Sequence, residues 1–289
     1  MNKFMLVVNT TADETAAYYQ THDIRYAPLS FTIGGKTIAE DCGQTMPFPV
    51  FYENLRKGNM SSTAQAQPAQ YLAHFRAACA AGHDVLYLGF SSGLSGSFDA
   101  GCMAAKEVQA EYPDRVIRCV DSLSATGGEA ILVEKARALR DMGKTADEAA
   151  LVLEDLRFRV IHLITVNDLN HLWRGGRVSR SSAMVGGLLG IKPMIYVNNA
   201  GKLEVCNKIR GRKKAIEHLH AAVVQQITDR TVPVRINHGD CLEDAQALAA
   251  LLAADGIDSK ILYAGTVIGS HAGPGLLTAF FVGSERKPF

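Results

Sequence analysis

The sequence predicts an α/β protein with two parts: a mostly parallel sheet with flanking helices, then an α+β region with a mixed or antiparallel sheet. Three observations support this fold class. In the first half, apolar runs typical of buried strands alternate with segments whose apolar residues recur at helical spacing. A turn rich in glycine and serine follows one of those strands at residues 89–97. In the second half, two strand-like segments joined around residues 198–201 predict a β-hairpin.

The first half repeats the strand–helix unit. The expected strands cover residues 4–8, 26–33, 85–88 and 116–120. The expected helices cover residues 13–21, 48–57, 68–81, 98–112 and 128–142. Repeated units of this kind imply a parallel sheet covered on both faces, in which ligands bind beyond the carboxyl ends of the strands.

The second half has a different pattern, which predicts an α+β arrangement. The expected strands cover residues 160–166, 192–197, 202–209, 232–237, 259–263, 266–269 and 276–282. The expected helical segments cover residues 167–173, 181–189, 213–227 and 242–254. Because 289 residues are many for one core, we expect two domains, residues 1–157 and residues 158–289.

Composition and charge exclude several classes of function. The net charge of +1 gives no general attraction to nucleic acid or to an acidic membrane surface. No apolar stretch approaches the roughly 20 residues of a spanning helix, so we expect no stable membrane insertion and a cytoplasmic location. The six cysteines are scattered and show no zinc-ligand spacing, which predicts reduced thiols and neither metal nor cofactor.

The turn at residues 89–97 is the most informative candidate site. A helix that begins just after such a turn offers unpaired amides and a positive dipole end, and serine hydroxyls add further donors for an anion. The same turn contains Gly89-Phe90-Ser91-Ser92-Gly93, which matches the nucleophile elbow of a serine hydrolase. Asp121 and His271 follow in the order of an α/β-hydrolase triad. A serine esterase using Ser91 is therefore the alternative, although the turn carries more donors than an elbow needs.

Other polar residues have open roles. Thr63 precedes the helix expected from Pro68, where a threonine commonly caps a helix or bonds within a loop. Arg177 and Arg210 flank glycines and could contact a phosphate or an acidic protein, or lie on a solvated surface. His271 could act as a base, bind an anion or serve the structure.

Several segments together resemble the DegV family of bacterial fatty-acid-binding proteins over nearly the whole chain. The matching segments are Asn9-Thr10-Thr11-Ala12-Asp13, residues 63–68, residues 91–97, Asp121-Ser122, Gly175-Gly176-Arg177-Val178-Ser179, residues 189–193 and residues 210–214. Asn9, Ala64 and Ala66 differ from the family pattern, which has aspartate, serine and proline there. We expect these three differences to affect the shape of the loops and the lipid that the protein prefers.

The resemblance implies two α/β-type domains with a long-chain fatty acid, C14–C18, buried between them. It implies that Thr63 and Ser95 donate hydrogen bonds to the carboxylate, and that the protein is a carrier rather than an enzyme. Family members of this kind present the acyl group to a separate ATP-dependent fatty-acid kinase, which yields an acyl phosphate. Arg177, Arg210 and His271 are the residues that we associate with the head group or the kinase.

Overall fold

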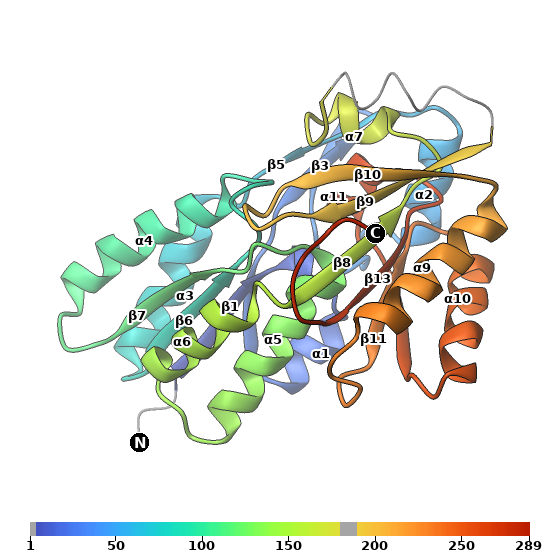
Figure 1. The fold of residues 1–289 in the computed structure, drawn as a ribbon. Coiled ribbons are helices and arrows are strands. Elements are labelled where there is room, and N and C mark those ends of the chain that lie inside the picture. Colours follow the sequence, from blue (N-terminus) through green and yellow to red (C-terminus); the bar gives the residue numbers. More distant parts are fainter. Residues whose placement is uncertain (1–3, 180–189) are drawn as a thin grey trace.

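The computed structural model describes residues 4–179 and 190–289. Within these ranges the chain forms three sheets and alternates layers of helix and sheet (Figure 1). The helix expected over residues 181–189 lies outside the described residues. The four-stranded parallel sheet lies wholly before residue 157 and the six-stranded mixed sheet wholly after it. The predicted fold class is confirmed, whereas the domain boundary at residues 157 and 158 stays a prediction.

The parallel sheet is the core of the N-terminal half. Its strands, in spatial order, are β2 (Ile24–Ala27), β1 (Phe4–Asn9), β6 (Asp84–Gly89) and β7 (Ile117–Asp121). The chain passes from β1 to β2 on one side, and β6 then pairs with β1 on the other side. The strand order therefore reverses between β1 and β6, which is where open α/β sheets bind ligands.

Helices cover both faces of this sheet because its strands are apolar on both sides. One face packs against α3 (Pro68–Ala80) and α4 (Ser97–Glu111). The other packs against α5 (Thr126–Asp141) and α6 (Ala146–Leu156). Helix α6 was not predicted, although Thr145 and Glu148 form a capping box at its start.

The C-terminal half is built on a mixed sheet. Its strands, in spatial order, are β10 (Leu203–Arg210), β9 (Ile191–Val197), β8 (Val160–Thr165), β13 (Leu277–Val282), β11 (Val234–His238) and β12 (Ser259–Tyr263). One face packs against α5, which thus lies between the two large sheets, and the other against α9 (Arg212–Gln226) and α10 (Leu242–Ala254) (Figure 1). The hairpin of β9 and β10 confirms the prediction from sequence.

The third sheet is small and antiparallel, was not predicted, and is formed by strands of the N-terminal half. It comprises β4 (Lys36–Ala39), β3 (Ser30–Ile33) and β5 (Ser61–Ala64), and it packs with α2 (Phe48–Arg56). The single strand expected over residues 26–33 is divided between β2 and β3. Thr63, expected in a loop before a helix, lies in β5 and pairs with Phe31. The short elements η1 (Thr10–Ala12), α1 (Ala16–Thr21) and α7 (Asn170–Arg174) complete the described chain, together with α11 (Thr266–Ala272).

The prediction of a strand over residues 266–269 is wrong, because these residues belong to α11. Val267 and Ile268 are β-branched, which favours a strand. A carboxylate distant in sequence overrides that preference. Glu40 accepts hydrogen bonds from the amides of Thr266 (3.1 Å) and Val267 (2.8 Å), the first donors of the helix.

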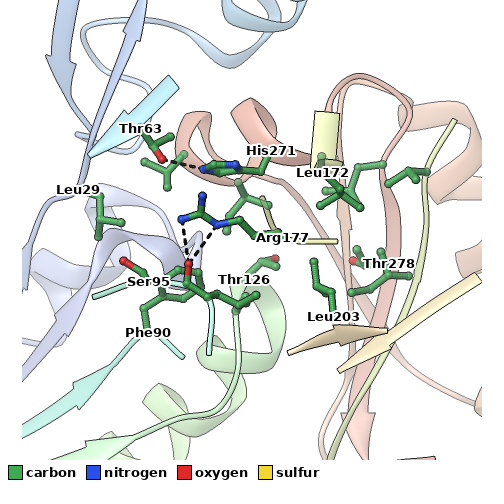
Figure 2. A pocket seen from close by; sticks show the side chains of 18 of the residues that line it. Leu29, Thr63, Phe90, Ser95, Thr126, Leu172, Arg177, Leu203, His271 and Thr278 are labelled. Carbon is green, nitrogen blue, oxygen red and sulfur yellow. Dashed lines mark hydrogen bonds between the residues drawn. The ribbon is translucent and has the colours of Figure 1, made fainter. Parts of the chain in front are cut away.

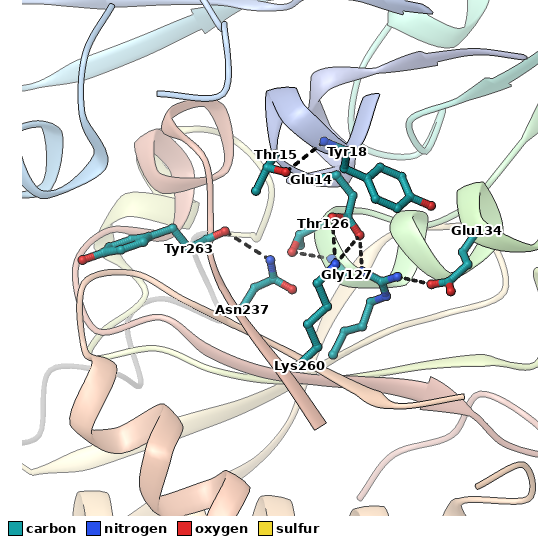
Figure 3. A network of polar contacts seen from close by, with 10 residues as sticks. Glu14, Thr15, Tyr18, Thr126, Gly127, Glu134, Asn237, Lys260 and Tyr263 are labelled. Carbon is teal, nitrogen blue, oxygen red and sulfur yellow. Dashed lines mark hydrogen bonds and ion pairs between the residues drawn. The ribbon is translucent and has the colours of Figure 1, made fainter. Parts of the chain in front are cut away.

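A polar network with a buried ion pair at its centre joins the two halves. Glu14, in the loop before α1, is paired with Lys260 of β12 (3.0 Å) and with Arg235 of β11. Arg235 also pairs with Glu134 of α5, which Figure 3 shows facing the same network. Because the side chain of Glu14 is 1% exposed, both cations are needed to offset the loss of its hydration.

Candidate functional site

A cavity of about 280 Å³ lies between elements of the two halves (Figure 2). Its wall combines the loop after β6, the start of α5 and α11 with strands β8, β10 and β13. Most of the side chains on this wall are apolar: Leu29, Phe90, Leu94, Ala125, Ile164, Val166, Leu172, Leu203, Val267, Ile268, Ala272 and Leu276. The cavity can therefore receive an elongated apolar group.

Polar side chains gather at one end of this cavity. Thr63 Oγ1 lies 2.7 Å from His271 Nε2, and Arg177 lies beside them (Figure 2). Arg177 donates through Nε and Nη2 to the carbonyl oxygen of Leu94, at 3.1 and 2.9 Å, so that it holds the backbone next to Ser95. Four of the five residues predicted for the head group thus come together. They are Thr63 from β5, Ser95 from the loop after β6, Arg177 from the segment after α7, and His271 from α11.

Ser95 is held by the first residue of α4. Its Oγ lies 2.9 Å from Ser97 Oγ and accepts a hydrogen bond from the Ser97 amide at 3.2 Å. If Ser97 Oγ donates in the 2.9 Å contact, the hydroxyl proton of Ser95 is free for a carboxylate in the cavity; in the opposite orientation Ser95 donates to Ser97 instead. The fifth predicted residue, Arg210, is exposed at the end of β10 and does not line the cavity.

His271 is neutral at physiological pH. Burial lowers the pKa of His271 to about 4, and the nearby Arg177 and His171 contribute to this shift. A neutral imidazole carries one N–H. If Nε2 carries it, His271 donates to Thr63, and the hydroxyl proton of Thr63 is free for an anion in the cavity. In the opposite tautomer Thr63 would donate to His271 and could not donate to a carboxylate.

A polar cleft of about 450 Å³ adjoins the cavity and shares Thr63, Arg177 and His271 with it. His171 and Arg174 add two further basic groups, and Ser61, Ser62 and Ser270 add hydroxyls. Sequence reasoning missed His171 as a site residue. His171 lies three residues before Arg174, so both side chains lie on one side of α7, and this spacing would have linked His171 to Arg174 and Arg177.

The serine-hydrolase alternative is not favoured by the geometry. Ser91 is fully buried and donates to the carbonyl oxygen of Gly201 at 2.8 Å. Asp121 accepts the amides of Ser92 (3.2 Å) and Leu123 (3.0 Å), and His271 bonds Thr63. Within the described ranges, none of the hydrogen bonds joins Ser91, Asp121 and His271.

Two further predictions concern metal and membrane. In residues 4–179 and 190–289 no group of three or more His, Cys, Asp or Glu side chains is arranged to hold a metal ion. None of the helices in the described chain is long and apolar enough to cross a membrane.

Known proteins are similar to this chain in fold and in sequence. A DegV domain-containing protein of Clostridium perfringens is 36% identical over all of both chains. A structure described as fatty acid binding of a DegV family protein from Thermus thermophilus has a TM-score of 0.87 at 26% identity, covering 98% of this chain and 100% of that one. The fatty acid binding DegV family protein of Streptococcus agalactiae gives 0.86 at 28% identity, covering 99% and 100%.

The model of one family, described as an uncharacterised protein of the DegV family, matches residues 3–284. This match covers nearly all of the chain and includes each segment quoted from the sequence. The chain belongs to the DegV family.

Proposed function

We propose that this protein binds a long-chain fatty acid, C14–C18, in the cavity and presents its carboxylate to a partner fatty-acid kinase. The observation that carries the proposal is the division of one cavity into an apolar wall and a polar end that holds Thr63, Ser95, Arg177 and His271. Solved relatives described as fatty-acid-binding proteins support it. In this proposal the protein is a carrier and not a catalyst by itself.

The energetics favour such a ligand. Burial of about 15 methylenes contributes on the order of 12 kcal/mol at about 0.8 kcal/mol per group. The carboxylate is the costly part, because an unpaired buried charge is strongly unfavourable. Hydroxyl donors at Thr63 and Ser95 offset this cost through charge-assisted hydrogen bonds. Neither hydroxyl needs a base to activate it, since neither acts as a nucleophile.

The cavity volume bears on chain length. A cavity of about 150 Å³ admits benzene, so a cavity of 280 Å³ houses a chain of roughly ten carbons before its walls move. A C14–C18 chain would fill it and displace side chains of its wall, such as Leu203. Competition binding with saturated acids from C8 to C18 tests this, and an optimum at C10 or below would contradict the proposed length.

The head-group assignment is tested by removing both hydroxyls. We expect Thr63→Ala combined with Ser95→Ala to weaken palmitate binding at least about 100-fold, because each lost hydrogen bond to a charge is worth about 1.5–3 kcal/mol. Methyl palmitate, which has no charge, should lose much less affinity. Thr37→Ala, which removes an exposed hydroxyl bonded to Thr32, is the matched control. Equal loss for acid and ester would mean that the two hydroxyls are structural.

The kinase step is the finer part of the proposal. The polar cleft beside the carboxylate end, with Arg174 and His171 on its wall, gives a phosphate donor an approach to the head group. Arg210 remains a proposed contact with the partner protein. With an ATP-dependent fatty-acid kinase and ATP, the loaded protein should yield an acyl phosphate that hydroxylamine traps. Free palmitate turned over equally well without this protein would contradict presentation.

A further inference from the structure

Helix α4 approaches the parallel sheet unusually closely at Gly101. A Cβ at this position would overlap the ring of Tyr87 on β6, so that only glycine allows this approach. Tyr87 is paired in register with Cys119 of the neighbouring strand β7. Cys102, the residue after Gly101, is therefore brought close to the sheet beside Cys119.

The orientation of both side chains supports this contact. Cys119 lies on the face of β7 that packs against α4, together with Ile117. Two turns after Cys102 along α4, Gln109 Oε1 accepts a hydrogen bond from the Ile117 amide at 3.1 Å. Cys102 and Gln109 share one edge of the helix, so that this edge faces β7.

The two thiols interact with each other. A hydrogen bond from Cys119 lowers the pKa of Cys102, and the same contact together with burial raises the pKa of Cys119. The thiolate is the reactive form of cysteine. Cys102 is only partly buried, so a small oxidant in solvent can reach it.

We propose that Cys102 and Cys119 form a reversible dithiol–disulfide site. The thiolate of Cys102 attacks hydrogen peroxide, the O–O bond breaks, and the leaving hydroxide takes up a proton to form water. The sulfur of Cys119 then attacks the resulting sulfenic acid. An S–S bond forms, the S–O bond breaks, and the departing hydroxide leaves as a second water with the proton of Cys119. The two thiols lose two electrons in all, and a small dithiol returns them.

This site is separate from the fatty-acid cavity but connected to it through the chain. Helix α4 begins at Ser97, directly after the Leu94, Ser95 and Gly96 segment of the cavity wall. Strand β7 ends at Asp121, shortly before Ala125 and Thr126 of the same wall. The disulfide would thus tie together the two elements that lead into the head-group end.

The test is peptide mapping of the full-length protein after hydrogen peroxide treatment. Free thiols are blocked with N-ethylmaleimide, and the protein is digested with trypsin without a reductant. We expect peptide 77–106 linked to peptide 119–135, an intact monomer that has lost two hydrogen atoms, and reversal by dithiothreitol. Two separately alkylated or separately over-oxidised peptides in the wild-type protein would overturn the proposal.

Variants assign the link to the right cysteine, because peptide 77–106 also carries Cys79. Cys79→Ser should retain the link, and Cys102→Ser should abolish it. A link that persists in Cys102→Ser would also overturn the proposal. Tandem mass spectrometry of the linked wild-type peptides also distinguishes Cys79 from Cys102, so the outcome does not depend on a variant that folds.

Discussion

At the residue scale, the protonation of His271 decides which hydrogen bonds the candidate site can make. His271 lies among Thr63, Arg177 and His171, and its lowered pKa keeps it neutral. A neutral imidazole can direct the hydroxyl proton of Thr63 toward a ligand, whereas an imidazolium would add a charge that the buried site disfavours. The sequence identified Thr63 and His271 separately, but their contact across 208 residues appears only in the fold.

Glu129 gives a pH-dependent prediction at the same scale. It is fully buried at the start of α5; Thr11 donates to its Oε2 at 2.8 Å, while Oε1 has no partner among the described residues. Burial, with Asp13 nearby, raises the pKa of Glu129 well above its usual value. Because the pKa of Glu129 is higher in the native state than in the unfolded state, its protonated form favours the native state at low pH. This contribution to stability is lost as the pH rises from the unfolded-state pKa, near 4.3, through the raised native-state pKa.

We therefore expect Glu129→Gln to gain stability relative to the wild type as pH rises from about 4.5 to 8. The gain should exceed about 1.4 kcal/mol, which corresponds to one pKa unit. Urea unfolding at several pH values measures it. Glu148→Gln is the control of opposite sign, because the Thr145 amide and Lys144 lower the pKa of Glu148. A pH-independent difference for Glu129→Gln would contradict the account.

At the element scale, α11 shows where sequence reasoning fails. Its β-branched residues predict a strand, but the cap that makes it a helix comes from Glu40, more than 220 residues away. The same limit applies to β5, which is defined by pairing with β3. The hairpin of β9 and β10 was predictable because its turn and its alternation are local.

Removal of this cap should affect both stability and binding. Glu40→Ala leaves two buried amides unpaired, at about 1–3 kcal/mol each. Because α11 carries Val267, Ile268 and His271 of the site wall, we expect palmitate affinity to fall at least several-fold. Calorimetric binding and urea unfolding measure the two effects.

The control for this variant is Thr15→Ala, which removes the cap of α1 away from the cavity. It should cost about 1 kcal/mol of stability and leave palmitate binding unchanged. If Glu40→Ala binds palmitate as tightly as the wild type, α11 does not need its cap to shape the site.

At the scale of the whole molecule, the site is built from both halves, with residues that range from Leu29 to Thr278. Short motifs located the polar end, because Thr63, Ser95 and Arg177 lie in recognisable segments. No local signal marked Ile164, Leu203 or Leu276 as cavity residues. Their role depends on how the mixed sheet meets the loop after β6, and this is a property of the tertiary structure.

The network of Glu14, Arg235 and Lys260 stabilises the contact between the two halves. We expect Arg235→Met to destabilise the protein by about 3–5 kcal/mol, because it leaves the buried Glu14 with one cation. Glu14→Gln in the same chain should restore part of the loss, which a double-mutant cycle measures. Arg76→Met, in an exposed cluster with Glu107 and Glu111, is the control and should change little. Strictly additive losses at Glu14 and Arg235 would contradict the coupling.

A crystal structure of the protein with palmitic acid tests whether the cavity holds a fatty acid by its carboxylate. We expect an elongated ligand along the apolar wall, with its carboxylate oxygens within about 3.2 Å of Thr63 Oγ1 and Ser95 Oγ. A palmitate bound elsewhere, or with its carboxylate toward Leu172 and Thr278 at the opposite end, would contradict it.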